Sequence, residues 1–183
     1  MDATADLKQD HIDIRRLKNI AQRCSDKLYA NTDVPIEDIK IISVIIEEFV
    51  DHFHHAKEEK AYFPETVNRN NFSEDIRRFL IEHELGRRIA RMLLRELKTL
   101  TDEAHSKEPT ARFLKSYAVF ITEHTSKEDE FLDLVSESKI ISIEENELLV
   151  KHYETCKNQM GGKERVEEMI KLIEYLEGRD WMK

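Results

Sequence analysis

Apolar residues recur three or four positions apart along most of this chain, which is the spacing of a buried face on an α-helix. The pattern predicts four long helices, at about residues 6–30, 36–65, 73–101 and 110–136. Short polar runs separate them, and Ser73 has the hydroxyl and the following acids of a helix N-cap. We therefore expect an all-α protein built on these helices.

The residues after 136 form a different kind of segment. Ser142 and Glu145 have the spacing of a capping box, and a helix is expected from there to about residue 160. The Gly-Gly pair at 161–162 should end it, and a last amphipathic helix follows. Neither helix carries a His and Glu pair on its apolar face, so we expect both to pack against the others as an extension over residues 141–178.

Each of the four long helices places one histidine on its apolar face. His11, for example, lies at helical spacing from both Leu7 and Ile14. The four inward histidines are His11, His54, His83 and His124. Two of them are followed four residues later by a glutamate, which is Glu58 after His54 and Glu128 after His124.

A histidine and a glutamate four residues apart stack one turn apart on a helix, so each pair offers two arms of a metal site. The alternative is that the histidines are core residues and the pairs face solvent, since 37% of the chain is charged. Burying imidazoles and carboxylates without a counter-charge is costly, however. One inward histidine on each of four helices therefore favours a pair of metal ions.

Four further histidines are expected at the surface, and they are His52, His55, His105 and His152. His55 is the best alternative ligand among them, because His55 and Glu59 repeat the four-residue spacing. The apolar phase nevertheless places His54 inward and His55 about 100° further round the helix. Tyr117 lies one heptad before His124, where it is either a hydrogen-bond donor over the site or a core tyrosine.

Over about residues 5–136 the pattern resembles the hemerythrin-like family, the HHE cation-binding domains. The matching stretches are His11; His54 and Glu58 with the trailing Glu59 and Phe63-Pro64; His83 in the run Glu82 to Arg87; and His124 and Glu128 with Asp129. The resemblance implies an up-down-up-down four-helix bundle with two extra C-terminal helices, all within one domain of residues 1–183. It also implies two non-haem irons, bridged by carboxylates and by an oxo or hydroxo group.

By this resemblance Glu58 and Glu128 bridge the irons, and the four inward histidines are terminal ligands. Animal oxygen carriers of the family place a second histidine one turn after the third-helix histidine, and here that residue is Arg87. Arginine stays protonated and does not ligate iron, so we expect it to pair with Glu59 or Asp129, or to point outward. The iron beside it is then expected to lack a nitrogen ligand and to take Glu59, Asp129 or water instead.

Composition and charge narrow the partners. The chain of 183 residues has only 4 Gly and 3 Pro, which is typical of a helical protein, and its net charge of -9 disfavours nucleic acid. No apolar run approaches the ~20 residues that span a bilayer, and the first residues lack the features of a signal peptide. Cys24 and Cys156 are far apart in the sequence and are interpreted as free thiols. We therefore expect a cytoplasmic protein without a membrane partner.

Three functions fit these observations. The first is a di-iron protein that binds or senses oxygen, nitric oxide or iron itself. The second is a di-iron redox enzyme, either an oxidase, a peroxidase or a nitric-oxide detoxifying protein. The third is a metal-free helical interaction protein, and in each case the C-terminal helices are available to dock a protein partner.

Overall fold

The computed structural model describes residues 2–99 and 106–183, and every regular element in that part of the chain is helical. The elements are α1 (Ala3–Tyr29), α2 (Ile36–Ile45), η1 (Ile46–His55), η2 (Glu58–Tyr62), α3 (Phe63–Thr66), α4 (Ser73–Thr99), α5 (Glu108–Ser138), α6 (Ile143–Met160), α7 (Gly162–Glu177) and η3 (Asp180–Met182). The predicted all-α class is therefore confirmed. None of the described helices is both long enough and apolar enough to cross a membrane.

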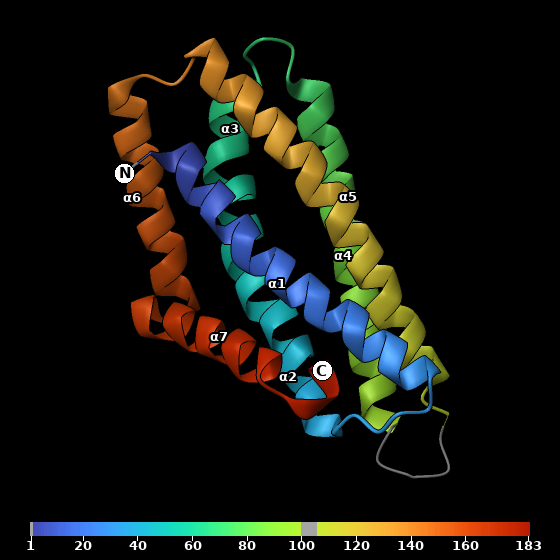
Figure 1. The fold of residues 1–183 in the computed structure, drawn as a ribbon. Helices are drawn as coiled ribbons and strands as arrows, with labels where there is room; N and C mark the ends of the chain where they lie inside the picture. The colour runs from blue at the N-terminus through green and yellow to red at the C-terminus, as the bar shows by residue number, and fades with distance from the viewer. Residues whose placement is uncertain (1, 100–105) are drawn as a thin grey trace.

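Four helical rods form the bundle, and successive rods run in opposite directions (Figure 1). The second rod is composite, because α2, η1, η2 and α3 follow one another along a single helical path from residue 36 to residue 66. Its η1 and η2 segments are π-helical, which means that their turns are wider than those of an α-helix. The predicted up-down-up-down bundle is confirmed, but its second helix is not regular.

The ends of the rods differ slightly from those predicted. Helix α1 begins at Ala3, where the side chain of Asp2 caps it by accepting a hydrogen bond from the Ala5 amide. Ser73, predicted as an N-cap, is instead the first residue of α4. Pro109, predicted in the break before the fourth helix, lies in the first turn of α5, where its missing N–H costs nothing. The predicted end of the third helix at residue 101 lies outside the described residues, which stop at Thr99.

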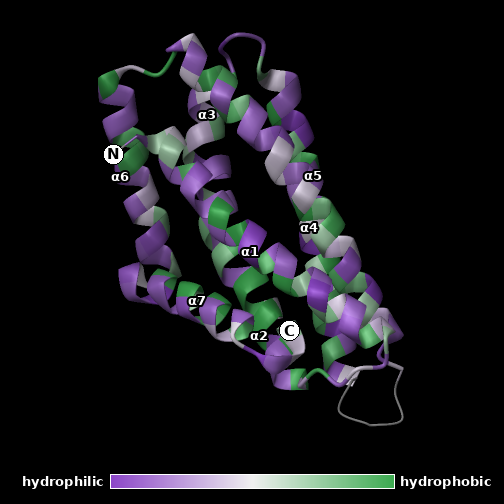
Figure 2. Ribbon diagram, viewed as in Figure 1, coloured by the Kyte–Doolittle hydropathy of each residue, from purple (hydrophilic) through white to green (hydrophobic). Residues whose placement is uncertain are grey.

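Two separate apolar clusters make up the core, one toward each end of the bundle. On α1, Leu7 belongs to one cluster and Ile14 to the other, and on α5 the corresponding residues are Phe131 and Ile121. Figure 2 shows hydrophobic and hydrophilic residues interspersed along the rods, as expected for amphipathic helices. The histidines and glutamates of interest lie between the two clusters, so they form a buried polar layer across the bundle.

Helices α6 and α7 pack on the side of the bundle formed by α1 and the second rod (Figure 1). The predicted capping box at the start of α6 is present, with Ser142 and Glu145 bonded reciprocally. Beyond α7, Trp181 donates from its indole nitrogen to the buried carboxylate of Asp38 at 2.7 Å, and Arg179 donates to the same carboxylate at 2.8 Å. These bonds attach the C-terminal end to α2.

Candidate metal centre

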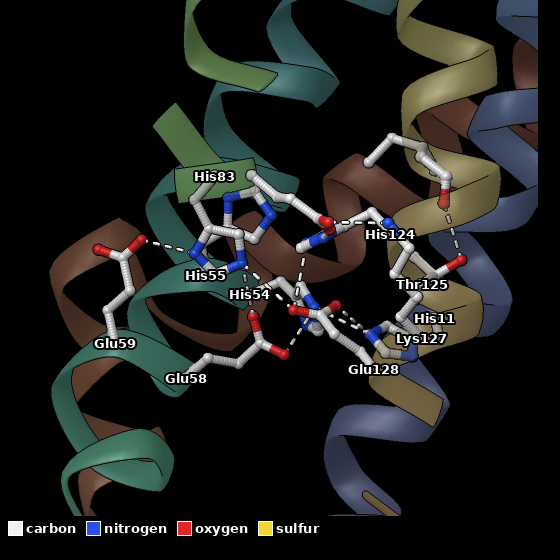
Figure 3. A network of polar contacts seen from close by, with 12 residues as sticks. His11, His54, His55, Glu58, Glu59, His83, His124, Thr125, Lys127 and Glu128 are labelled. Carbon is white, nitrogen blue, oxygen red and sulfur yellow. Dashed lines mark hydrogen bonds and ion pairs between the residues drawn. The ribbon is translucent and has the colours of Figure 1, made fainter. Parts of the chain in front are cut away.

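The four histidines and two glutamates predicted as ligands meet in the buried polar layer. Figure 3 shows their side chains converging from four rods on a common centre. They are His11, His54, Glu58, His83, His124 and Glu128, and each is at most 1% exposed. The helical phases predicted for these residues are therefore correct.

His55 is also in this layer, so its predicted surface position is wrong. It is 3% exposed, and its ring stacks on that of His83 with a centroid separation of 3.8 Å. His52 and His152 are exposed as expected, and His105 lies outside the described residues.

The π-helical turns of η1 explain why the phase of His55 was missed. In an ideal α-helix adjacent residues point about 100° apart, so only one of His54 and His55 would face the core. In a π-helix each turn holds more residues, and adjacent side chains diverge less. The rings of His54 and His55 consequently both turn inward, with centroids 5.7 Å apart. The four-residue spacing from His55 to Glu59 was the feature of the sequence that pointed to an inward His55. Glu59 itself does not lie with His55 among the potential ligands.

The potential ligand atoms fall into two groups, in each of which all atoms lie within 4.8 Å of one another. One group is His55, His83 and His124, and the other is His11, His54, Glu58 and Glu128. Such spacing is what a single metal ion in each group would require, because ligand atoms about 2 Å from a metal lie within ~4 Å of one another.

Glu58 and Glu128 lie between the histidines of the two groups, and each directs one oxygen toward His11 or His54 and the other toward His83 or His124. The distances from Glu58 to histidine Nε2 atoms are 3.5 Å from Oε1 to His54 and 3.4 Å from Oε2 to His83. Those from Glu128 are 3.1 Å and 3.3 Å from Oε1 to His124 and His83, and 3.5 Å from Oε2 to His11. A carboxylate with this placement can bridge two cations.

Unsatisfied polar atoms provide a test of whether cations fit here. Among the described residues, seven buried side-chain nitrogens and oxygens have no hydrogen-bond partner, and five of them are in this layer. The five are Nε2 of His55, both oxygens of Glu58, Nε2 of His124 and Oε2 of Glu128. Leaving buried polar atoms unpaired costs about 1–3 kcal/mol each. Metal ions would pair these atoms, so the donor set fits a metal centre.

Each of the five inward histidines uses its other ring nitrogen, Nδ1, to donate to a carboxylate. The pairs are His11 with Asp129 at 2.8 Å, His54 with Asp10 at 3.0 Å, His55 with Asp51 at 3.4 Å, His83 with Glu59 at 2.7 Å and His124 with Glu82 at 2.8 Å. An ionised carboxylate only accepts hydrogen bonds, so Nδ1 of each histidine carries a proton, and the Nε2 that faces the centre can bind a cation once it has no proton of its own. This arrangement is characteristic of histidines that bind metals.

Four of these acids stand next to a predicted ligand in the sequence yet hold a histidine on another rod. Asp10 of α1 holds His54, Glu59 of η2 holds His83 of α4, Glu82 of α4 holds His124 of α5, and Asp129 of α5 holds His11 of α1. The four bonds thus run from rod to rod and close into a ring around the bundle. Glu59 and Asp129, which were considered as ligands, are members of this ring instead.

Arg87 spans two of the acids that hold the histidines. Its Nε donates to Asp51 at 2.6 Å and its terminal nitrogen to Glu59 at 2.7 Å. The predicted pairing with Glu59 is confirmed, whereas Asp129 pairs with Arg15. Through these acids one guanidinium fixes the two stacked imidazoles, His55 and His83.

Among the lysines and arginines that the structure describes, Lys57 is the most deeply buried, with 1% of its side chain exposed. Its ammonium lies 2.5 Å from both Asp6 and Asp10. It also lies over two aromatic rings, 4.5 Å from that of Phe53 and 5.1 Å from that of Tyr153 on α6. The C-terminal extension therefore contributes directly to the surroundings of the acid that holds His54.

The protonation of the metal-free layer follows from burial and from the two glutamates. Burial opposes charge on His11, but hydrogen bonds to Asp129 and Glu128 outweigh it and raise its pKa to about 9. The pKa of His83 is raised well above its ordinary value for similar reasons, whereas burial and the charge on His83 lower that of His55 to about 3. His11 and His83 are therefore imidazolium groups in the metal-free layer, and entering cations must displace their Nε2 protons.

Gly86 allows an aromatic ring to pack against the centre. A Cβ at Gly86 would lie 2.6 Å from a ring carbon of Phe120, which stacks on His124 with centroids 5.1 Å apart. The close approach of the Phe120 side chain therefore explains why a glycine stands in the middle of this helix.

We expect Gly86→Ala to destabilise the protein although alanine favours helices. Overpacking costs roughly 1–3 kcal/mol, and the helix gains only about 1 kcal/mol. The free energy of unfolding should therefore fall by up to about 2 kcal/mol, which thermal unfolding followed by circular dichroism would detect. Gly178→Ala is the matched control, because its Cβ would lie an ordinary 3.5 Å from the Tyr175 carbonyl oxygen. Equal or higher stability of Gly86→Ala would show that Phe120 moves freely.

Tyr117 is not a hydrogen-bond donor over the centre. It is 2% exposed, and its hydroxyl makes no hydrogen bond with the residues that the structure describes. Of the two alternatives raised by the sequence, the core tyrosine is correct.

Comparison with known families supports this description of the layer. A family model described as the hemerythrin HHE cation-binding domain matches residues 2–135. Comparisons with curated proteins and with solved structures gave no match. The matched range includes α1 to α4 and nearly all of α5, and it contains every residue placed in the polar layer.

Proposed function

Because this chain belongs to the hemerythrin HHE cation-binding domain family, we propose that the cations it binds are two irons held in the polar layer. His55, His83 and His124 would hold one iron, and His11 and His54 the other. Glu58 and Glu128 would bridge them. Imidazole and carboxylate donors from facing helices, without a thiolate, are the ligand set of di-iron proteins.

The observation that carries this proposal is the set of five buried, unpartnered donor atoms in one layer. A metal-free interaction protein has no use for them, because each destabilises the fold unless a cation is present. The Nδ1 bonds support the same conclusion, since they orient every Nε2 toward the centre before any metal arrives.

The number of histidines differs between the two groups, and this difference bears on where a small ligand would bind. Beside Arg87, where a nitrogen ligand was expected to be missing, the His55 ring stacks on His83, and in this proposal it supplies that nitrogen. The group with His11 and His54 has one histidine fewer. We therefore propose that oxygen or nitric oxide binds at the iron held by His11 and His54. The irons would supply the redox activity and the open position for such a ligand.

Metal analysis of the purified protein tests the proposal, with His55→Ala as the informative variant. The unmodified chain should contain about two irons, and the variant should retain about one, because only the group of three histidines loses a donor. His52→Ala is the matched control, since His52 lies three residues earlier on the same rod and is exposed. No metal, or a single tightly held zinc, in the unmodified chain would refute the di-iron proposal, and full occupancy of His55→Ala would remove His55 from the ligands.

A further inference from the structure

A cavity of about 190 Å³ lies between η1 and α4, next to the polar layer but outside it. The apolar part of its lining comprises Ile46, Val50, Gly86, Ala90, Leu94 and Tyr117, and the polar part comprises Glu47, Asp51, His52, His55, Arg87 and Arg91. Of the proposed ligands, His55 is the one that lines the cavity. A molecule inside would therefore touch a ligand histidine rather than a metal.

The size of the cavity sets the size of the molecule that it can hold. A cavity of about 150 Å³ is large enough for benzene, so the volume here is enough for a single six-membered ring with one small substituent. Buried residues of three helices, with Val50 on η1, Gly86 on α4 and Tyr117 on α5, form its walls. Such a wall favours an apolar ring over water, which needs two or more polar partners.

The charged residues of the lining favour a neutral molecule. They are Glu47, Asp51, Arg87 and Arg91, so two acids are matched by two bases. Asp51 and Arg87 are also already paired with one another at 2.6 Å. A ligand with a net charge would meet no excess of the opposite charge.

One lining residue of the cavity carries a hydroxyl. The hydroxyl of Tyr117, a wall residue, has no hydrogen-bond partner among residues 2–99 and 106–183, so it can donate to or accept from a guest. Burial, together with the charge of Asp51, raises the pKa of Tyr117, and the hydroxyl therefore stays protonated. A guest with one hydroxyl of its own matches this wall.

We propose that this cavity is a binding site for a small neutral phenol, held beside His55 with its hydroxyl bonded to Tyr117. This site goes beyond the proposed di-iron function. It does not depend on that function, because the cavity is lined by protein residues and needs no iron to form.

Isothermal titration calorimetry of the protein as purified, with phenol and with toluene as probes, tests this inference. Phenol should bind at one site, and a crystal soaked in phenol should show it between η1 and α4. Tyr117→Phe should weaken phenol roughly three- to tenfold, the effect of one lost hydrogen bond, and leave toluene unchanged. Ala90→Leu should abolish the binding of both by filling the cavity.

The matched control is Met92→Leu, an exposed position on the same helix that does not line the cavity. Circular dichroism would confirm that each variant is folded. Absence of phenol binding to the unmodified protein, or equal binding to Ala90→Leu, would overturn the inference. Iron content measured on the same samples keeps the two proposals separate, because phenol binding and iron loading can each fail alone.

Discussion

Replacing Glu58 by glutamine should remove both irons from the chain, because this residue directs one oxygen to each group of histidines. Loss of even a supporting hydrogen bond weakens metal binding 10–100-fold, so loss of a bridging ligand should weaken it by at least roughly that factor. The amide keeps the shape of the side chain but lacks the charge that offsets two cations. Metal analysis of the purified variant would measure the effect.

Stability measurements on the same variant separate loss of a ligand from loss of the fold. Burial raises the pKa of Glu58, which means that the metal-free protein already disfavours its charged form. Glu58→Gln should therefore unfold no more easily than the metal-free parent. Glu47→Gln, at an exposed position on the same rod, should keep both irons. Two irons in Glu58→Gln would show that the bridge is formed by other residues.

Replacing Lys57 by methionine should cost about 3–5 kcal/mol of unfolding free energy, the usual effect of removing one partner from a buried ion pair. Methionine matches the length of the side chain, but it leaves Asp6 and Asp10 without their shared cation. Burial already raises the pKa of Asp10 to about 6, and the charge of Lys57 opposes that rise. Without the cation Asp10 should become protonated near neutral pH and hold His54 less firmly.

Chemical denaturation would give the change in free energy, and metal analysis should show reduced iron in the group that contains His54. Lys60→Met is the matched control, because Lys60 is exposed on the same rod and its ammonium lies 3.4 Å from Gln159. Equal stability of the two variants would mean that Asp6 and Asp10 find other partners or accept protons without cost.

Much of the fold and half of the site chemistry could be predicted from the sequence. The spacing of apolar residues located four long helices, and the same spacing placed His11, His54, His83 and His124 inward. For His11, His83 and His124 this worked because α1, α4 and α5 are regular, so one phase holds over their whole length. A histidine that replaces an apolar residue in such a stripe must face the core.

The parts that were missed depend on departures from regularity and on the register between helices. His55 was assigned to the surface because a constant α-helical phase was assumed where the rod is π-helical. The acids that hold the histidines could not be assigned, since Asp10 lies next to His11 in sequence but bonds to His54. Which acid bonds to which histidine depends on the axial register of neighbouring helices. The spacing of apolar residues within one helix contains no information about that register.

The ring of acids that joins the rods also bears on when the centre can form during synthesis. In each of the four bonds of this ring the histidine and the acid belong to different rods. The partner of His11 is Asp129, which emerges from the ribosome 118 residues later. At about 5–20 residues per second, the early segments are exposed for many seconds before α5 appears. During that time His11 and His54 lack their full set of neighbours. A nascent chain should therefore capture iron poorly, and loading should follow the docking of α5 rather than precede it.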